Sequence, residues 1–412
     1  MEYGLIGEKL GHSFSKTVHN KLADYEYELL EIKPQDLEEF IRIKNFKAIN
    51  VTIPYKELVI PYLDEIDDVA KKIGAVNTVV NRNGKLYGFN TDFFGLSGLI
   101  EYNGITLSSK KVLILGSGGT SKTAYAVAES LNAREICVVS RKGGNGFITY
   151  EEAYKNHKDA EIIINTTPCG MYPNNQSMAI DINCFNKLNA VIDVIYNPIK
   201  TALVIEAEKR GITAIGGLYM LISQAVFAAE KFLSSQIEKE KTENIFKEIL
   251  KEKQNIVLIG MPSCGKSTIG KMLSEKSGKT FVDTDEEIVK LSKMAIPEIF
   301  EKYGENHFRD LESEVIKEVS KKQETIIATG GGAILRQENI DLLKQNSILF
   351  FIDRPLEFLE STADRPLSSN REMLEKRYNE RYEKYVSAAD KIIKVSNDLE
   401  ENLSLIKEGF FE

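Results

Sequence analysis

The stretch Gly260-Met261-Pro262-Ser263-Cys264-Gly265-Lys266-Ser267 decides the fold of the last part of the chain. It follows the apolar run at 255–259 and leads into a helical pattern from Thr268. The two glycines let the backbone curl so that successive N–H groups point inward, toward a phosphate. Lys266 then reaches the outer phosphates, and Ser267 is placed to ligate Mg²⁺. The spacing predicts a phosphate-binding loop for a nucleoside triphosphate rather than a plain glycine-rich turn.

Length and charge limit what the rest of the chain can do. At about 150 residues per domain, 412 residues predict two or three domains. The apolar content of 42% with 28% charged residues is typical of a folded globular protein. The net charge of -8 argues against nucleic acid or an anionic membrane as a partner, because their phosphates would be repelled. Small-molecule substrates are therefore expected.

The sequence predicts a cytoplasmic protein. It contains no run of about 18 apolar residues, and Met1-Glu2-Tyr3-Gly4 lacks the basic and apolar regions of a secretion signal. No cysteines form a CxxC pair, which fits free thiols in a reducing compartment. The four histidines show no metal-ligand spacing, so a zinc site is not expected. The cysteines are Cys137, Cys169, Cys184 and Cys264.

The first hundred residues alternate short apolar runs with helical patterns, the rhythm of an α/β domain. Ser13 and Ser15 lie two residues apart after the first predicted strand, so on an extended loop their hydroxyls face one side and suit a polyol or carboxylate. Helix capping by either serine is the alternative. Lys56 follows a strand, and Asp92 follows a Gly-Phe-Asn-Thr turn. Held together, these two residues suit general acid–base chemistry on an alcohol or ketone; apart, they are a solvated lysine and a turn cap.

A second nucleotide signature follows the buried-strand pattern at 111–115. The sequence Gly116-Ser117-Gly118-Gly119-Thr120-Ser121 predicts a Rossmann-type turn, with Ser121 where the third glycine usually stands. The next strand, 135–139, ends in Ser140-Arg141-Lys142 instead of the acidic residue that would bind an NAD ribose. Two cations favour a 2′-phosphate and hence NADP, although ordinary surface charges are the alternative.

Residues 1 to about 250 resemble shikimate dehydrogenase. Matching segments occur in that family's order: His12-Ser13-Phe14-Ser15, Asn50-Val51-Thr52-Ile53-Pro54-Tyr55-Lys56, Ile73-Gly74-Ala75-Val76-Asn77-Thr78, Asn90-Thr91-Asp92, the Gly116 turn, Tyr196-Asn197-Pro198 and 217–224. The resemblance implies that Lys56 and Asp92 form the catalytic pair. It assigns the substrate to Ser13, Ser15, Thr52, Asn77, Tyr196 and Gln224. It assigns NADP to Gly116, Gly118, Gly119, Ser140, Arg141, Lys142, Gly217 and Met220, the last two beside the nicotinamide.

Behind the phosphate loop, charged residues follow predicted strands and helices. Asp283 and Asp285 lie at i and i+2 after a strand, where one carboxylate orients Mg²⁺ and the other holds a substrate hydroxyl; a helix N-cap is the alternative. Arg309, Arg365 and Arg381 and the turn Gly330-Gly331-Gly332 suit an anionic substrate beside a nucleotide.

Residues 255–412 together resemble shikimate kinase. The resemblance assigns shikimate to Asp285, Arg309, Gly331, Gly332 and Arg381, and Mg²⁺ to Ser267 and Asp283, the latter through water. It assigns ATP to Gly260, Ser263, Cys264, Gly265, Lys266, Ser267, Thr268 and Arg365, the last on a lid. Lys266, Asp285 and Arg365 would be the catalytic residues.

The expected architecture is α/β throughout. Residues 1–100 form the dehydrogenase substrate domain, completed by helices at 219–250, and 101–218 form a Rossmann NADP-binding domain. Residues 251–254 are a linker, and 255–412 form a P-loop kinase with a parallel sheet flanked by helices. We expect a bifunctional enzyme of aromatic amino acid (chorismate) biosynthesis, which reduces 3-dehydroshikimate with NADPH and phosphorylates shikimate with ATP.

Two alternatives stay open. In the first alternative, the kinase-like domain only senses nucleotide. ATP binding without shikimate turnover would favour this alternative. In the second alternative, the dehydrogenase domain prefers quinate to shikimate. A side-by-side comparison of quinate and shikimate oxidation would reveal this preference. Channelling between the two sites is a separate hypothesis, and the oligomeric state does not follow from the sequence.

Overall fold

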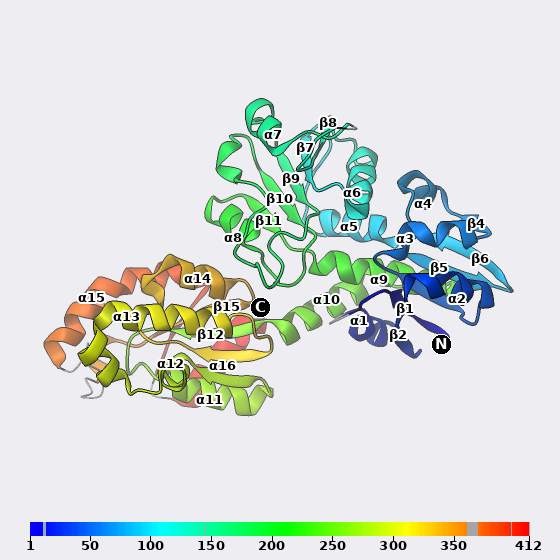
Figure 1. Ribbon diagram of the computed structural model, residues 1–412. Coiled ribbons are helices and arrows are strands. Elements are labelled where there is room, and N and C mark those ends of the chain that lie inside the picture. The colour runs from blue at the N-terminus through cyan, green and yellow to red at the C-terminus, as the bar shows by residue number, and fades with distance from the viewer. Residues whose placement is uncertain (11–13, 145, 361–369, 397, 412) are drawn as a thin grey trace. The chain divides into compact units, whose positions relative to one another are not determined.

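A computed structural model describes residues 1–10, 14–144, 146–360, 370–396 and 398–411 of the chain (Figure 1). The chain divides into two compact units, Met1–Glu248 and Ile249–Glu412. Helix α10 (Lys239–Lys253) includes residues 251–253, which the sequence predicts as linker. The fold class is α/β, as predicted, with three sheets among the described residues. In this part of the chain no helix has the length and apolar character that a membrane span needs.

The first sheet is mixed and has the order β2-β1-β3-β5-β6-β4. Strands β1, β2 and β3 are parallel, and β5 runs antiparallel to both β3 and β6. A core that includes Ile6, Ile49 and Val79 lies between this sheet and its helices. The strands are β1 (Tyr3–Gly7), β2 (Tyr27–Glu31), β3 (Ala48–Val51), β4 (Glu65–Ile66), β5 (Thr78–Arg82) and β6 (Lys85–Phe89). The helices are α1 (Ser15–Leu22), α2 (Leu37–Ile43), α3 (Tyr55–Leu58) and α4 (Asp68–Ile73).

The second sheet is parallel, with the order β11-β10-β9-β7-β8. Its inner strands are almost wholly apolar because helices cover both faces. The chain leaves β7 to one side for β8 and returns to the other side for β9, so the crevice beyond the end of β7 is where such sheets bind ligands. The elements are β7 (Lys111–Leu115), β8 (Glu135–Val139), β9 (Ile162–Asn165), β10 (Ala190–Asp193), β11 (Thr213–Ile215), α6 (Gly119–Ser130), α7 (Tyr150–Asn156) and α8 (Ala202–Lys209).

Two long helices pack against each other in the first unit: α5 (Thr91–Tyr102) and α9 (Leu218–Leu233). Glycines let their backbones approach closely. A Cβ added at Gly95 would lie 2.7 Å from the Cβ of Gln224, and one at Gly98 would lie 2.7 Å from the Oγ of Ser223. Because α5 begins with Thr91 and Asp92 while α9 carries Met220 and Gln224, this pair fixes predicted catalytic, nucleotide and substrate residues to one another.

The second unit has a five-stranded parallel sheet in the order β13-β14-β12-β15-β16. Its apolar core is built on β12, β14 and β15. The strands are β12 (Asn255–Ile259), β13 (Thr280–Asp283), β14 (Thr325–Ala328), β15 (Ser347–Asp353) and β16 (Lys391–Lys394). The helices are α11 (Lys266–Ser277), α12 (Thr284–Ser292), α13 (Ile296–Val319, broken at Gly304), α14 (Gln337–Lys344), α15 (Arg371–Ala388) and α16 (Leu399–Phe411).

Two candidate active sites

The amine of Lys56 donates a hydrogen bond to the Oδ2 of Asp92, so the two residues predicted as a catalytic pair are in contact. Lys56 lies in the short helix α3, and Asp92 lies in the first turn of α5. Both side chains are mostly buried, with 24% and 14% exposed. Asn90 holds the start of α5 in place, because its Oδ1 accepts from the N–H of Phe93 at 3.2 Å and its amide donates to the carbonyl of Ala75 at 3.0 Å.

A buried polar network connects Asn77 to Gln224 through Thr91. The Oδ1 of Asn77 accepts from the N–H of Thr91 at 2.7 Å, and the Oγ1 of Thr91 lies 3.4 Å from the Oε1 of Gln224. Thr78 joins it, with its Oγ1 3.1 Å from the Oγ1 of Thr91. The network places two predicted substrate residues next to the helix turn that carries Asp92.

The other predicted substrate residues approach from separate elements. Ser15 is the first residue of α1 and is nearly buried, and Thr52 follows β3 and is partly exposed. Tyr196, in the loop after β10, meets Phe14 edge to face at 5.5 Å between ring centroids, which brings that loop to the start of α1. Burial raises the pKa of Tyr196, so its hydroxyl stays protonated at neutral pH. Ser13 lies outside the described residues.

The turn after β7 has the geometry of a phosphate cradle. Gly116 has a φ of 110° and packs against the Oγ1 of Thr166, so a side chain there would be strained and crowded. Gly118 is the N-cap of α6, and a Cβ added at Gly118 or Gly119 would meet no atom within 4 Å. Ser121 is buried, and its Oγ donates to the carbonyl of Gly118 at 2.7 Å. The helix start is therefore open around Gly118 and Gly119, which leaves room for an anion.

The residues after β8 divide between a buried serine and two exposed cations. The Oγ of Ser140 accepts from the N–H of Gly143 at 3.0 Å and shapes the turn, whereas Arg141 and Lys142 are exposed. At the start of α9, a Cβ on Gly217 would lie 2.1 Å from the carbonyl oxygen of Val194, so only glycine fits. Met220, one turn later, is nearly buried.

Sequence reasoning missed the carboxylate of Asp193 at the end of β10. It is fully buried and accepts from Asn165 at 3.1 Å, from Thr201 at 2.7 Å and from the N–H of Ile195 at 3.0 Å. Burial raises its pKa to about 6, against the three hydrogen bonds that lower it. The signal was an acidic residue closing an apolar strand. Asp193 holds together the loops that follow β9 and β10.

In the second unit, the phosphate loop opens onto a cavity of about 480 Å³. The cavity brings together most residues predicted for ATP, Mg²⁺ and the phosphoryl acceptor: Ser263, Gly265, Lys266, Ser267, Thr268, Asp283, Asp285, Arg309, Gly330, Gly331, Gly332 and Arg381. Gly260 and Cys264 belong to the loop but do not line the cavity. They pack against each other, since a Cβ on Gly260 would lie 2.9 Å from the sulfur of Cys264. Arg365 lies outside the described residues.

Lys266, the lysine of the phosphate loop, is buried and bonded to the backbone of the loop itself. The Nζ of Lys266 donates to the carbonyls of Gly260 and Met261, both at 2.9 Å. The Oγ of Ser267 donates to the Oδ2 of Asp283 at 2.6 Å. Asp283 also caps α12 by accepting from the N–H of Asp285 at 3.0 Å. Asp285 thus lies in a helix turn rather than on the predicted strand end, yet both carboxylates line the cavity.

Arg309 is buried between two carboxylates of its own helix. Its Nη1 donates to Glu312 at 2.7 Å and its Nη2 to Glu305 at 3.1 Å. The pKa of Glu312 is raised, because burial raises it more than the guanidinium of Arg309 lowers it. A Cβ on Gly332 would lie 2.0 Å from the Nη1 of Arg309, so this glycine leaves room for the guanidinium.

A second arginine reaches the cavity from α15. The Nη1 of Arg381 donates to the carbonyl of Gly331 at 2.9 Å, and the hydroxyl of Tyr385 donates to the same oxygen at 2.5 Å. Arg377 also lines the cavity, and burial together with the charge of Arg381 lowers its pKa. An anionic ligand would relieve this repulsion. Helical spacing could have identified the two missed residues, since Glu312 is three residues after Arg309 and Arg377 is four before Arg381.

Comparison with known proteins identifies the two halves separately. Residues 5–79 match the family model of the shikimate dehydrogenase substrate binding domain, and residues 262–408 match that of shikimate kinase. Shikimate dehydrogenase (NADP(+)) from Clostridium perfringens is 37% identical over 265 residues, 60% of this chain and 97% of the relative.

Solved structures agree with the match of the first unit to shikimate dehydrogenase. A chorismate mutase/shikimate 5-dehydrogenase fusion protein from Clostridium acetobutylicum is 35% identical with a TM-score of 0.57, over 60% of this chain and 96% of the other. Shikimate 5-dehydrogenase from Listeria monocytogenes, solved with shikimate and NAD, is 29% identical with a TM-score of 0.55, over 61% of this chain and 96% of the other. The chain therefore belongs to the shikimate dehydrogenase family and carries, in residues 262–408, a shikimate kinase domain of the same pathway.

Proposed function

We propose that the chain catalyses two consecutive reactions of the shikimate pathway. The first unit reduces 3-dehydroshikimate to shikimate with NADPH, and the second transfers the γ-phosphoryl group of ATP to the 3-hydroxyl of shikimate. The observation that carries this proposal is the composition of the second cavity, which combines a phosphate loop with a carboxylate and two arginines suited to a small hydroxylated acid. The first unit makes such an acid.

The fit of NADP(H) to the first unit rests on the open turn at Gly118 and Gly119 and on the exposed cations Arg141 and Lys142. When bound, NADPH supplies the hydride that reaches the ring carbonyl carbon. Lys56 donates a proton to the carbonyl oxygen, and Asp92 orients the ammonium group through their hydrogen bond. One proton and one hydride convert the ketone to the alcohol.

Substrate binding in the first unit is assigned to hydroxyl and amide groups. Asn77 and Gln224 belong to the network around Thr91, next to Asp92, and we assign ring hydroxyls of the substrate to them. Ser15, Thr52 and Tyr196 complete the set, and Ser13 keeps the role that the sequence predicts. The Listeria monocytogenes relative crystallised with shikimate supports this substrate class.

In the second unit the charges divide by task. Arg309 and Arg381 bind the carboxylate of shikimate, and Asp285 orients the attacking 3-hydroxyl. Lys266 and the loop N–H groups bind the phosphates, and Arg365 is proposed to close over ATP. Two hard oxygen donors 2.6 Å apart, Ser267 and Asp283, fit Mg²⁺, which neutralises phosphate charge when bound. The site lowers the barrier by positioning and charge neutralisation.

The decisive experiment follows 3-dehydroshikimate, NADPH and ATP in one pot by mass spectrometry. The wild-type chain is expected to make shikimate 3-phosphate. Lys56→Met should make none from 3-dehydroshikimate but should still phosphorylate added shikimate. Asp285→Asn should accumulate shikimate, and a mixture of the two variants should restore the product because the intermediate is diffusible.

Three outcomes would contradict the proposal. ATP binding without shikimate-dependent ADP formation would leave the second unit as a nucleotide sensor. Faster oxidation of quinate than of shikimate would reassign the first unit. Absence of NADP reduction with either acid would contradict the proposed dehydrogenase reaction.

Because the cytoplasm supplies both NADPH and ATP, it is the proposed location of the enzyme.

A further inference from the structure

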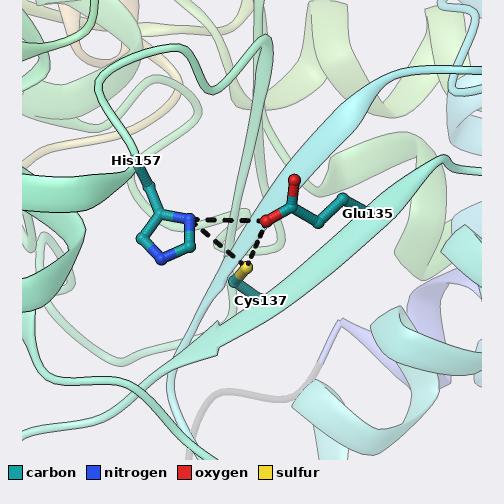
Figure 2. A group of neighbouring side chains, drawn as sticks. All are labelled: Glu135, Cys137 and His157. Atoms are coloured by element: carbon teal, nitrogen blue, oxygen red, sulfur yellow. Dashed lines mark hydrogen bonds and ion pairs between the residues drawn. The ribbon is translucent and has the colours of Figure 1, made fainter.

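Three side chains of types that bind metals, Glu135, Cys137 and His157, meet beside β8, the edge strand of the second sheet. Glu135 and Cys137 lie two residues apart on β8, so their side chains project to the same face of the sheet. His157, the residue after α7, approaches them from the chain that covers this face (Figure 2). The sequence distance between Cys137 and His157 is the reason that no metal-ligand spacing was visible.

The three ligand atoms form a nearly regular triangle. The sulfur of Cys137 lies 3.5 Å from the Oε1 of Glu135 and 3.6 Å from the Nδ1 of His157, and Oε1 and Nδ1 are 3.6 Å apart. Tetrahedral zinc, with bonds of about 2.3 Å to sulfur and about 2.0 Å to nitrogen and oxygen, separates its sulfur from each lighter ligand by about 3.5 Å and nitrogen from oxygen by about 3.3 Å. The three ligand atoms therefore already lie at the separations that tetrahedral zinc requires.

The charges around the triangle are compatible with a dication. The Nζ of Lys111 lies 3.2 Å from the same Oε1 of Glu135 and 3.0 Å from the Oδ1 of Asp159, so it would exchange its pair with Glu135 for the pair with Asp159 when a metal binds. Asp159 can keep this buried ammonium neutralised while Glu135 turns to the metal. A thiolate and a carboxylate then balance the charge of Zn²⁺, and a neutral imidazole completes the set.

A redox thiol explains the cluster less well. Burial raises the pKa of Cys137 to about 11, and the nearby carboxylate of Glu135 adds to this, so the nucleophilic thiolate is scarce. Zinc must displace that proton, a cost that the metal–sulfur bond offsets. The cluster is also separate from the nucleotide turn, because Cys137 precedes Ser140 by three strand residues, about 10 Å.

We propose that Glu135, Cys137 and His157 bind one zinc ion, with the fourth position open to water. The ion would clamp the end of α7 to β8, whose far end leads to the proposed NADP residues. This site is independent of the proposed function, since none of its ligands lies in either active site.

Cobalt is the probe for the site, because a sulfur ligand gives Co²⁺ a charge-transfer absorption that an all-oxygen magnesium site cannot produce. The full chain, stripped of metal by chelator, is titrated with Co²⁺ and then with Zn²⁺. We expect one equivalent of Co²⁺ with the charge-transfer band and the intense d–d bands of four-coordination, displaced by Zn²⁺, and a rise in the inactivation temperature of the dehydrogenase on Zn²⁺ addition.

The variants separate this site from others. Cys137→Ser should abolish the charge-transfer band, and His157→Gln should weaken binding at least about tenfold. Cys184→Ser is the matched control, because Cys184 is another half-buried thiol of the same domain. Dehydrogenase activity without metal confirms that each variant is folded. An unchanged band in Cys137→Ser, or no cobalt band in the wild type, would overturn the proposal.

Discussion

The hydroxyl of Ser267 donates a 2.6 Å hydrogen bond to the carboxylate of Asp283, although β14 separates their strands, β12 and β13, in the sheet. The bond therefore joins the phosphate loop, which follows β12, to the start of α12, which follows β13. Both oxygens are hard ligands suited to Mg²⁺. The arrangement leads to a first prediction about the kinase reaction.

Ser267→Ala should reduce kcat of the kinase by at least about 100-fold at a Mg²⁺ concentration that saturates the wild type, because electrostatic stabilisation of the transferring phosphoryl group is lost. The NADP-dependent oxidation of shikimate should be unchanged in the same preparation. ADP release and NADPH absorbance measure the two rates. A loss restored by excess Mg²⁺ would indicate weakened metal affinity alone, and an unaltered kinase rate would exclude Ser267 as a metal ligand.

Lys56→Met should lower kcat of the dehydrogenase by about 10²–10⁴-fold, the usual contribution of a positioned acid or base. Asp92→Asn keeps the shape of the pair but removes the charge that orients the ammonium, so it should cause a smaller loss. Steady-state kinetics with shikimate and NADP⁺ test both variants, and the kinase rate is the internal control. Equal KM effects with unchanged kcat would mean that the pair only binds substrate.

Arg141→Ala should raise KM for NADP⁺ about tenfold or more and leave KM for NAD⁺ nearly unchanged, because only NADP⁺ has the 2′-phosphate. Lys142→Ala, at the neighbouring exposed position, shows how much of the effect is general charge. Parallel losses with both cofactors would contradict a 2′-phosphate contact.

Gly332→Ala should raise KM for shikimate in the kinase reaction, because its Cβ would lie 2.0 Å from the Nη1 of Arg309 and force the guanidinium to move. The affinity for ATP should change little, since the collision involves the proposed carboxylate site. Isothermal titration with each ligand separates the effects. Unchanged shikimate kinetics would show that Arg309 does not bind the acid.

His19 should make the first unit sensitive to acid. Burial lowers its pKa to about 3 from 6.5, so between these values the unfolded chain binds a proton that the folded chain does not. Its contribution to the free energy of unfolding is complete above about pH 6.5 and is lost as the pH falls toward 3, by up to several kcal/mol.

The variant His19→Phe tests this pH dependence. It keeps the stacking on Tyr27, now 3.9 Å between ring centroids, but loses the 2.6 Å bond to Tyr25 and the titration. Its dehydrogenase half-inactivation temperature should fall less between pH 7 and pH 5 than that of the wild type. Substitution of the exposed His307 in the second unit is the control. Parallel pH profiles would assign the acid sensitivity to other groups.

Much of the fold followed from local sequence. The apolar runs at 111–115 and 255–259 coincide with β7 and β12, because strands buried on both faces show no polar alternation. The run at 135–139 coincides with β8, although this edge strand is only partly buried. Lys56 follows β3, as expected, and lies in the short helix α3. Asp285 lies in α12 and not at a strand end, because Asp283 caps a helix there. Such boundaries depend on capping, which single residues only suggest.

The site residues were predictable where a motif fixes several at once. The phosphate loop and the three-glycine turn after β14 line one cavity, as their motifs imply. Asp193 and the triangle around Cys137 were not predicted, because their chemistry depends on partners from other elements, such as Asn165 for Asp193 and His157 for Cys137. Spacing along the chain carries no signal for partners that lie 20 or 28 positions apart, as in these two cases. Glu312 was missed although it lies one helical turn from Arg309.

The close approach of α5 and α9 has a consequence for how this sequence can evolve. A side chain gained at position 95 would collide with the Cβ of Gln224, and one gained at position 98 would collide with Ser223. Neither helix can drift alone without separating Asp92 from the substrate residues of its neighbour. Among homologues, positions 95 and 224, and likewise 98 and 223, are therefore expected to change together or not at all.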